Sequence, residues 1–244
     1  MPGKSSCLFV LCILVLASFC VESFANSTVQ QAAPGPEIFA PGVISGPANE
    51  GSPTFSPDGN TLFFTISSSH WSIILESSRI KGHWSVPRIA PFSGEWPDAS
   101  PAMSPDGSYL IFVSVRPLNH ASDDSRQSAG SRAAASHIWR VNRLGSGWSA
   151  PVELPASVNF CNAIFRPSVA ADGTIYFVAA PDKAKNLSLF RSRFENGAYQ
   201  NAEPLPFSDG STKDVDPEVA PDQSFVIFSS RGRWPGESAH EHLF

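Results

Sequence analysis

The chain has 244 residues and a formal net charge of -5, and it contains 22 prolines, 17 glycines and 18 phenylalanines. Few charges combined with many turn-forming and aromatic residues favour a turn-rich all-β protein over a helical one. A mildly acidic balance without a Lys/Arg run argues against nucleic acid as the main partner.

Residues 1–25 have the layout of a secretory signal peptide. Lys4 supplies a positive charge, an apolar run extends from Cys7 to Phe19, and Ser23-Phe24-Ala25 places small residues at the −3 and −1 positions of a cleavage site. The apolar run is shorter than a typical membrane span. We therefore expect a periplasmic or secreted mature chain that begins near Asn26, with no stable membrane span after signal removal.

Two alternatives to a cleaved signal remain. A lipoprotein signal would end at Cys20, but the bulky Phe19 before it does not suit that motif; an uncleaved anchor is the other alternative. Cleavage would remove three of the four cysteines and leave Cys161. A single cysteine cannot form an internal disulfide, so stability must come from the packed core.

One short stretch recurs four times. Pro53–Phe64 reads PTFSPDGNTLFF, which is typical of two β-strands joined by a tight turn, and related stretches begin at Pro101, Pro167 and Pro217. The turn positions that we assign a structural role are Asp58, Gly59, Asp106, Gly107, Asp172, Gly173 and Asp222.

A second landmark follows each turn except the last: an aromatic residue at Trp84, Trp148 and Tyr199. The two landmarks define a unit of about 50 residues with four strand-sized pieces, which is typical of a β-propeller blade. In the first unit the expected strands are 53–56, 61–66, 72–79 and 84–89. Residues 119–136 carry no apolar periodicity and are expected to form a surface loop within the second unit.

The expected organisation is a signal peptide (1–25), a flexible lead-in (26–36) and propeller repeats (37–244). The repeats divide at approximately 45–92, 93–158, 159–208 and 209–244, and the last unit is incomplete.

The Ser-Pro-Asp-Gly hairpin with its aromatic second strand, together with the Gly-Trp-Ser-x-Pro segment at Trp148, resembles the Pro-Asp variety of WD-like repeat in TolB-like β-propellers. The resemblance covers Glu37 to Phe244 and implies an all-β propeller of about four visible four-stranded blades. Because such propellers typically have six blades, we expect an incomplete six-bladed ring. The alternative is a closed four-bladed ring in which Glu37–Ile44 supplies the missing strand of the last blade.

Charged residues gather at the ends of the expected strands that lie opposite the Pro-Asp-Gly turns. Glu50, Asp98 and Asp214 precede the first-strand prolines by three positions, and Arg116 and Arg231 follow the second strands. Such carboxylates and guanidinium groups could form a ligand-binding rim around a central funnel. The alternative is that the acids bind nearby backbone amides and serve folding alone.

The sequence favours an exported, non-enzymatic scaffold that binds a protein or glycan partner. No catalytic residue, metal ligand or cofactor is predicted. The alternative is a propeller-fold hydrolase acting on glycosides, which would use two of the rim carboxylates as acid and base. If Asp98 belongs to an exposed rim, its replacement by Ala should leave folding largely intact.

Overall fold

The computed structural model describes residues 35–117, 135–181, 183–234, 236 and 240–244. All the regular secondary structure in these residues is β, and residues 38–244 form one compact unit. The expected signal peptide, nearly all of the lead-in and most of the 119–136 segment lie outside the described residues.

Four antiparallel sheets follow one another along the chain. The first contains β1 (Asn49–Phe55), β2 (Thr61–Ser67), β3 (Ser72–Ile80) and β5 (Arg88–Ile89). The second contains β6 (Asp98–Met103), β7 (Tyr109–Ser114), β8 (His137–Leu144) and β10 (Val152–Glu153). The third contains β11 (Ile164–Val169), β12 (Ile175–Ala179), β13 (Ser188–Ser192) and β16 (Glu203–Pro204). The fourth contains β17 (Lys213–Val219), β18 (Val226–Arg231) and β19 (Glu241–Leu243).

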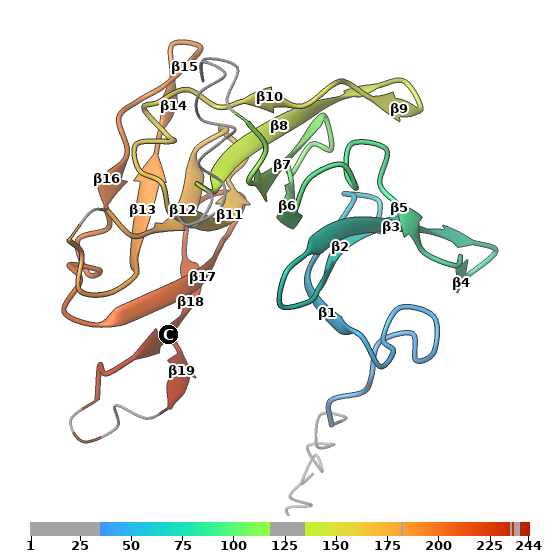
Figure 1. Cartoon of the computed structure of the whole chain (residues 1–244), viewed down its shortest axis with the longest axis horizontal. Coiled ribbons are helices and arrows are strands. Elements are labelled where there is room, and N and C mark those ends of the chain that lie inside the picture. The colour runs from blue at the N-terminus through green and yellow to red at the C-terminus, as the bar shows by residue number, and fades with distance from the viewer. Residues whose placement is uncertain (1–34, 118–134, 182, 235, 237–239) are drawn as a thin grey trace, which may run out of the picture. The chain divides into compact units, whose positions relative to one another are not determined.

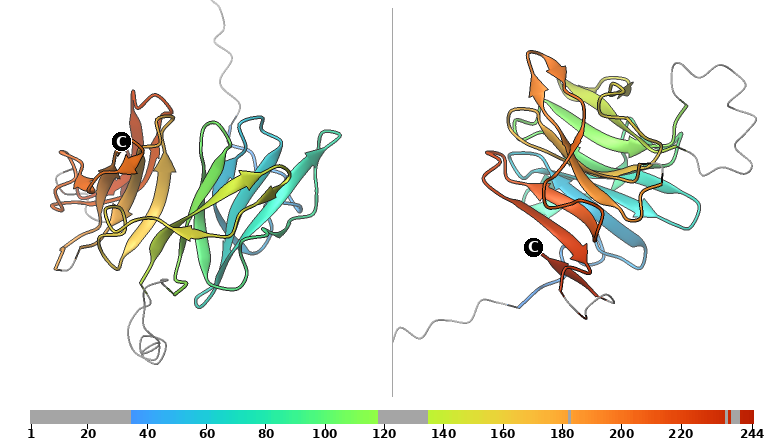
Figure 2. Two further views of the ribbon diagram at one scale, coloured as in Figure 1. Left: turned by 90° about the horizontal axis from the view of Figure 1, so that it is seen from above. Right: turned by 90° about the vertical axis from the view of Figure 1, so that its left-hand side faces the viewer.

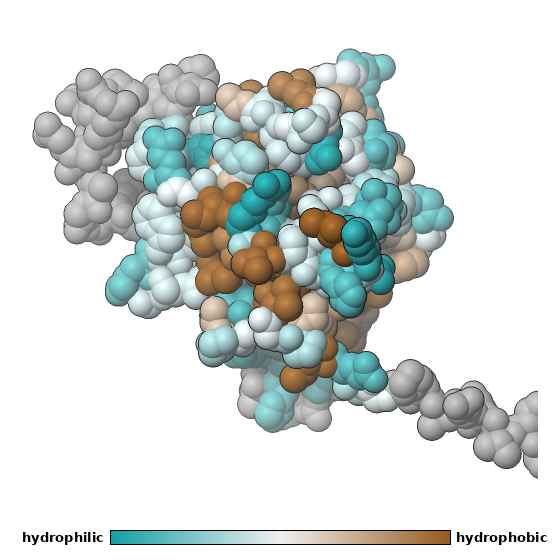
Figure 3. Space-filling model, turned by 90° about the vertical axis from the view of Figure 1, so that its right-hand side faces the viewer, coloured by the Kyte–Doolittle hydropathy of each residue, from teal (hydrophilic) through white to brown (hydrophobic). Residues whose placement is uncertain are grey.

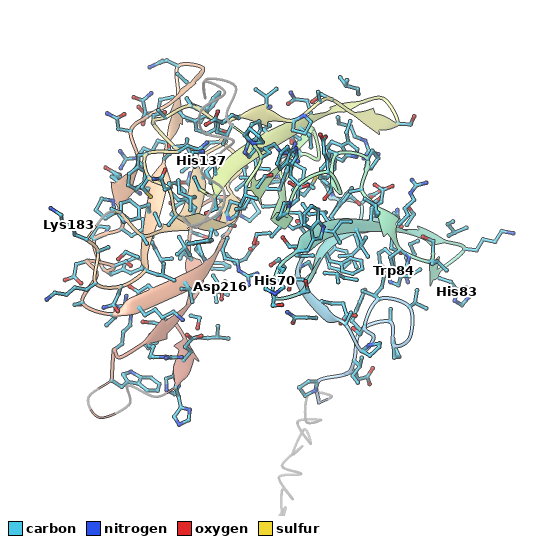
Figure 4. The ribbon with its side chains drawn as sticks, viewed as in Figure 1. His70, His83, Trp84, His137, Lys183 and Asp216 are labelled. Atoms are coloured by element: carbon cyan, nitrogen blue, oxygen red, sulfur yellow. The ribbon has the colours of Figure 1, made fainter. Side chains whose placement is uncertain are left out.

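The landmark aromatics lie in short additional strands rather than in the last strand of each sheet. These strands are β4 (His83–Trp84), β9 (Gly147–Trp148) and β15 (Ala198–Tyr199), the last of which pairs with β14 (Phe194–Glu195). The expected single strand over 84–89 is therefore wrong, because β4 pairs with one end of β3 while β5 pairs further along it. Trp84 lies at the outer end of the first blade (Figure 4).

The sheets are arranged side by side in chain order, as the blades of a propeller (Figures 1 and 2). The expected all-β propeller with four visible blades is thus confirmed, and the last unit, expected to be incomplete, has three strands in the described part of the chain. The alternative in which Glu37–Ile44 supplies a fourth strand to blade 4 is not observed in the described residues.

Apolar packing between successive sheets builds the core. Phe63 and Ile74 of blade 1 pack against Leu110 and Phe112 of blade 2. We call the face of each sheet that packs against the next blade its forward face, and the opposite face its backward face. Because strand side chains alternate between the two faces, every sheet buries one face on each neighbour.

The same arrangement recurs at the other two interfaces. Ile111 and Ile138 form the forward face of blade 2, and Tyr176 and Leu189 form that of blade 3. Backbone groups join the blades as well: the Met103 amide donates to Thr54 Oγ1 at 3.0 Å. The four repeats are therefore one structure held together by equivalent interfaces.

The backward face of blade 1 is covered by residues 38–45, which we call the N-terminal layer. Ile44 is buried there against Leu62 and Phe64, and the Phe39 ring lies 5.8 Å from the ring of Trp84. The layer therefore takes part of the place that a preceding blade would occupy.

The repeated turns have the local geometry that their sequence implies. Asp58 and Asp106 each accept a hydrogen bond from the backbone amide two residues further on. Gly59 and Gly107 follow with φ of 68° and 72°, a region that suits glycine. The two glycines differ in their surroundings, since a Cβ on Gly107 would lie 3.0 Å from Pro57 Cδ whereas Gly59 faces open space.

This difference gives a matched pair of variants. Gly59→Ala and Gly107→Ala introduce the same backbone strain, of order 1 kcal/mol, but only Gly107→Ala also crowds the turn of blade 1. We expect Gly107→Ala to lower the free energy of unfolding by about 1 kcal/mol more than Gly59→Ala, measured by chemical denaturation. Equal losses in the two variants would contradict the packing of this turn against Pro57.

His137 is a buried titratable group of blade 2. Its Nδ1 lies 3.5 Å from Glu153 Oε1, close enough for an ion pair when the imidazole is protonated. Burial lowers the pKa of His137, and the neighbouring Glu153 only partly opposes this. The folded protein therefore binds this proton less readily than the unfolded chain.

The sign of the resulting pH dependence follows from linkage. The stability that neutral His137 contributes is present above the ordinary pKa of 6.5 and is lost as pH falls from there towards the lowered pKa. We expect the free energy of unfolding to depend less on pH, between about 7.5 and 5.5, in His137→Gln than in the wild type. Burial raises the pKa of Glu218, which acts in the opposite direction but is common to both proteins. Identical pH profiles would show that His137 does not titrate in this way.

Candidate functional site at the propeller axis

The first strands of all four blades carry the same irregularity immediately before their proline. The register between first and second strands shifts there, as at Gly51/Thr54 in blade 1. The residue before each proline has a positive φ, which is uncommon for residues other than glycine. These residues are Ser52 (49°), Ser100 (52°), Arg166 (51°) and Asp216 (54°). Such bulges re-aim side chains, and they are often found near functional sites.

The four pre-proline residues come together between the blades. Arg166 Nε lies 3.0 Å from Asp216 Oδ1, and Arg166 Nη1 donates to Ser52 Oγ. The guanidinium of blade 3 thus contacts both blade 4 and blade 1. Asp216 lies on the inner side of blade 4 (Figure 4). Arg166 and Asp216 are each about half exposed, so solvent reaches the pair.

Two cavities meet at this group of residues. One, of about 600 Å³, is lined by Phe55, Met103 and prolines of the first strands and turns; we call it the turn-side chamber. The other, of about 590 Å³, includes Glu50, Lys213 and Glu241 in its lining; we call it the loop-side chamber. The residues common to both linings are Ser52, Ser100, Arg166 and Asp216. Together the chambers form a central channel that is narrowed at Arg166.

Two of the expected rim residues, Asp98 and Arg116, form an ion pair inside the protein. Arg116 Nη2 lies 2.8 Å from Asp98 Oδ1, and the Asp98 carboxylate has no exposed surface. Ser93 Oγ donates to Asp98 Oδ2 at 2.9 Å, while the guanidinium lies 5.0 Å from the centre of the Phe112 ring. This contact ties the loop after blade 1 to the first two strands of blade 2.

Asp214, another expected rim residue, lies in a matching cluster in blade 4, where its partner is Arg233. Arg233 Nη2 lies 2.8 Å from Asp214 Oδ2, to which Ser208 Oγ also donates at 2.6 Å. Asp214 is fully buried, and Arg231 instead lies 3.3 Å from Glu241. The structure therefore places neither Asp98 nor Asp214 in the lining of the channel.

Glu50 is the expected rim residue that does line the channel, in the loop-side chamber. Its Oε1 accepts a hydrogen bond from the Gly46 amide at 3.2 Å, a local contact of the kind considered as the alternative. Ile164, at the equivalent position of blade 3, is buried in the core.

Sequence reasoning missed most of the residues at the axis. Ser52, Ser100, Arg166 and Asp216 all hold the position before the first-strand proline of their units. Because the residue types at this position differ, residue type alone could not reveal the site. The signal in the sequence was the shared position, immediately before each repeated proline. Within the described residues no group of three His, Cys, Asp or Glu side chains is arranged to hold a metal ion. No helix in this part of the chain is long and apolar enough to cross a membrane.

Several solved structures are similar to this chain. TolB from Acinetobacter baumannii is 22% identical with a TM-score of 0.49, and the match covers 76% of this chain and 38% of TolB. A puromycin-hydrolysing peptidase of Mycobacterium tuberculosis is 17% identical with a TM-score of 0.48, covering 78% of this chain and 27% of the peptidase. The Hadza microbial sialidase Hz136 is 14% identical with a TM-score of 0.48, covering 80% of this chain and 43% of the sialidase.

The chain thus spans less than half of each of these three proteins. No protein-family model matches it, and no curated protein matches it in sequence. The three proteins named above include a peptidase and a sialidase, so the likeness leaves the activity of this chain open.

The burial of Asp98 reverses the expectation that its removal would be harmless. Asp98→Ala leaves the Arg116 guanidinium, which is only 11% exposed, without its counter-charge. Loss of one partner of a buried ion pair typically costs about 3–5 kcal/mol. We expect a loss of that order in thermal or chemical unfolding, and partial recovery in the double variant Asp98→Ala/Arg116→Leu. A loss in Asp98→Ala as small as for an exposed carboxylate would contradict the buried pair.

Proposed function

We propose that this protein is an exported, non-enzymatic scaffold that binds an extended polypeptide segment of a partner protein in its central channel. The observation that carries the proposal is the pair of cavities, about 600 and 590 Å³, that meet at the Arg166–Asp216 pair. Cavities of this size are within the range of binding sites in proteins.

The chemistry of the two chambers favours a polypeptide over a glycan. Proline rings, Phe55 and Met103 give the turn-side chamber an apolar wall that suits aliphatic or aromatic side chains. Lys213 and Glu241 give the loop-side chamber charges of both signs, and Arg166 can bind a carboxylate or a backbone carbonyl. An extended chain offers apolar, charged and carbonyl groups in alternation, so it can use both chambers at once.

The glycoside-hydrolase alternative receives less support from the geometry. It requires two carboxylates that face one substrate, one as acid and the other as base or nucleophile. Asp98 and Asp214 are fully enclosed by their arginine and serine partners, so neither can reach a glycosidic oxygen in this conformation. Glu50, Asp216 and Glu241 do line the loop-side chamber, but Asp216 is paired with Arg166 and Glu241 with Lys213. Export is supported by the sequence of residues 1–25, and a periplasmic or secreted location belongs to the same proposal.

Binding in the channel can be tested with peptides selected from a displayed random-peptide library on the purified wild-type protein. We expect Arg166→Ala to weaken the selected peptides roughly ten- to a hundredfold, because charge-assisted hydrogen bonds contribute about 1.5–3 kcal/mol. Ser52→Trp should weaken them as well by filling the channel. Both residues are solvent-accessible, so folding should be unaffected.

Val86→Ser is the matched control, since Val86 is exposed and outside both chamber linings. If the selected peptides bind Arg166→Ala and Ser52→Trp as tightly as they bind the wild type and the control, the channel is not the binding site. An oligosaccharide array is probed in parallel with the wild type and Arg166→Ala. The glycan alternative is favoured if Arg166→Ala weakens oligosaccharide binding and does not weaken peptide binding.

A further inference from the structure

In blades 1 and 3 the third strand forms an ion pair with the fourth strand at one equivalent position. Glu76 lies opposite Arg88 across β3 and β5, and Arg191 lies opposite Glu203 across β13 and β16. Arg88 Nε donates to Glu76 Oε1 at 2.7 Å, and Arg191 Nε donates to Glu203 Oε1 at 2.8 Å. Both blades thus neutralise a charge on the third strand, although the signs of the two partners are exchanged.

Arg140 holds this position in blade 2, but the residue opposite it across β8 and β10 is Val152. Arg140 Nε donates to the neutral Asn142 Oδ1 at 2.8 Å, and none of the described carboxylates forms an ion pair with the guanidinium. The exposure of Val152 is not itself informative, because apolar side chains also reach the surface on the side of blade 1 (Figure 3). Blade 2 differs from its neighbours in having a half-buried cation that lacks a counter-charge in the described part of the chain.

A cavity of about 200 Å³ lies beside Arg140, between the turns of blades 2 and 3; we call it the inter-blade pocket. Tyr109, Phe194 and Tyr199 contribute aromatic walls, and the guanidinium lies 3.8 Å from the centre of the Tyr109 ring. Burial raises the pKa of Tyr109 and of Tyr199, so both phenols are neutral near neutral pH and neither supplies the missing negative charge. A ligand that brings an anionic group to Arg140 would therefore gain charge-assisted hydrogen bonds beside an aromatic surface.

Carboxylates in the lining of the pocket limit the kind of anion that it can hold. Asp106 Oδ1 accepts hydrogen bonds from Ser104 Oγ and from both the amide and the hydroxyl of Ser108. These hydrogen bonds lower the pKa of Asp106, so its carboxylate is ionised, while its Oδ2 receives no hydrogen bond from the other described residues. Asp172 of the next turn lines the pocket as well. Two carboxylates disfavour a polyanion such as phosphate and favour a ligand that also carries a positive charge.

We propose that the inter-blade pocket binds a free amino acid, with the carboxylate on Arg140 and the ammonium group beside Asp106. The ligand gives Arg140 the counter-charge that Glu203 gives Arg191 in blade 3. The volume of the pocket lies below the usual range for drug-sized ligands, which suits a molecule as small as an amino acid. The aromatic walls favour an aliphatic or aromatic side chain on that ligand over a charged one.

Binding is tested on the purified full chain with free L-amino acids at millimolar concentration, first by ligand-observed NMR and then by calorimetric titration. Each amino acid that binds is compared with two probes: its amide, which lacks the carboxylate, and the matching carboxylic acid, which lacks the amino group. We expect both probes to bind more weakly than the amino acid by about tenfold or more. A wild-type protein that binds none of the amino acids, or that binds either probe as tightly as the amino acid, would overturn the proposal.

Two variants test the role of each charge. Arg140→Met keeps an unbranched apolar stem but removes the guanidinium, and we expect it to weaken amino-acid binding roughly ten- to a hundredfold. Asp106→Asn keeps an oxygen acceptor for the hydrogen bonds of the turn and removes the negative charge. It should weaken binding of the amino acid but leave binding of the matching carboxylic acid unchanged, a difference that a purely structural change would not produce.

Arg191→Met is the matched control, because it removes the equivalent arginine of blade 3, which already has Glu203 as its partner. It should bind the amino acid as tightly as the wild type does, and cooperative thermal unfolding is verified for every variant. Equal affinities of Arg140→Met and the wild type would overturn the proposal, as would equal losses in Arg140→Met and Arg191→Met. Because Arg140, Asp106 and Arg191 lie outside both chamber linings, none of these results bears on peptide binding in the channel.

Discussion

The structure depends on the burial of each sheet face against the next sheet. A strand presents side chains to two sides, and the second strand of each blade is apolar on both, as in Leu62-Phe63-Phe64. Such a sheet cannot leave either face in water without losing about 25 cal/mol per Å² of exposed apolar surface. Stacking the sheets around an axis buries both faces of blades 2 and 3. It leaves the backward face of blade 1 and the forward face of blade 4 without a neighbouring sheet.

The clusters at Asp98 and Asp214 extend this constraint to the loops between blades. Each carboxylate accepts from a serine of the preceding loop and pairs with an arginine that follows the second strand. The loop and two strands of each such blade therefore share one buried charge network, whose members depend on each other. Because these carboxylates are used in folding, they do not line the channel, whereas Arg166 and Asp216, at the pre-proline bulges, line both of its chambers.

The sequence predicted the features that depend on local chemistry. The Pro-Asp-Gly turns and the apolar second strands can be recognised within a few residues, and their spacing was enough to predict the blades. It could not show that Asp98 is enclosed, because that depends on Ser93 and Arg116 approaching from separate segments. Arg231 was expected at the rim, but it lies 3.3 Å from Glu241 and is about half exposed, and Arg233, which sequence reasoning did not consider, pairs with Asp214. The alternative in which Glu37–Ile44 completes the last blade rested on its resemblance to the segment around β5, yet it pairs with no strand of blade 4 in the described residues.

Hydrogen–deuterium exchange of the second strands tests the central claim, that each blade is protected by the blade that follows it. In dilute protein, amides of β18 should exchange much faster than those of β7 and β12, whose forward faces are covered. Slow exchange of β18, equal to that of β7, would contradict the account.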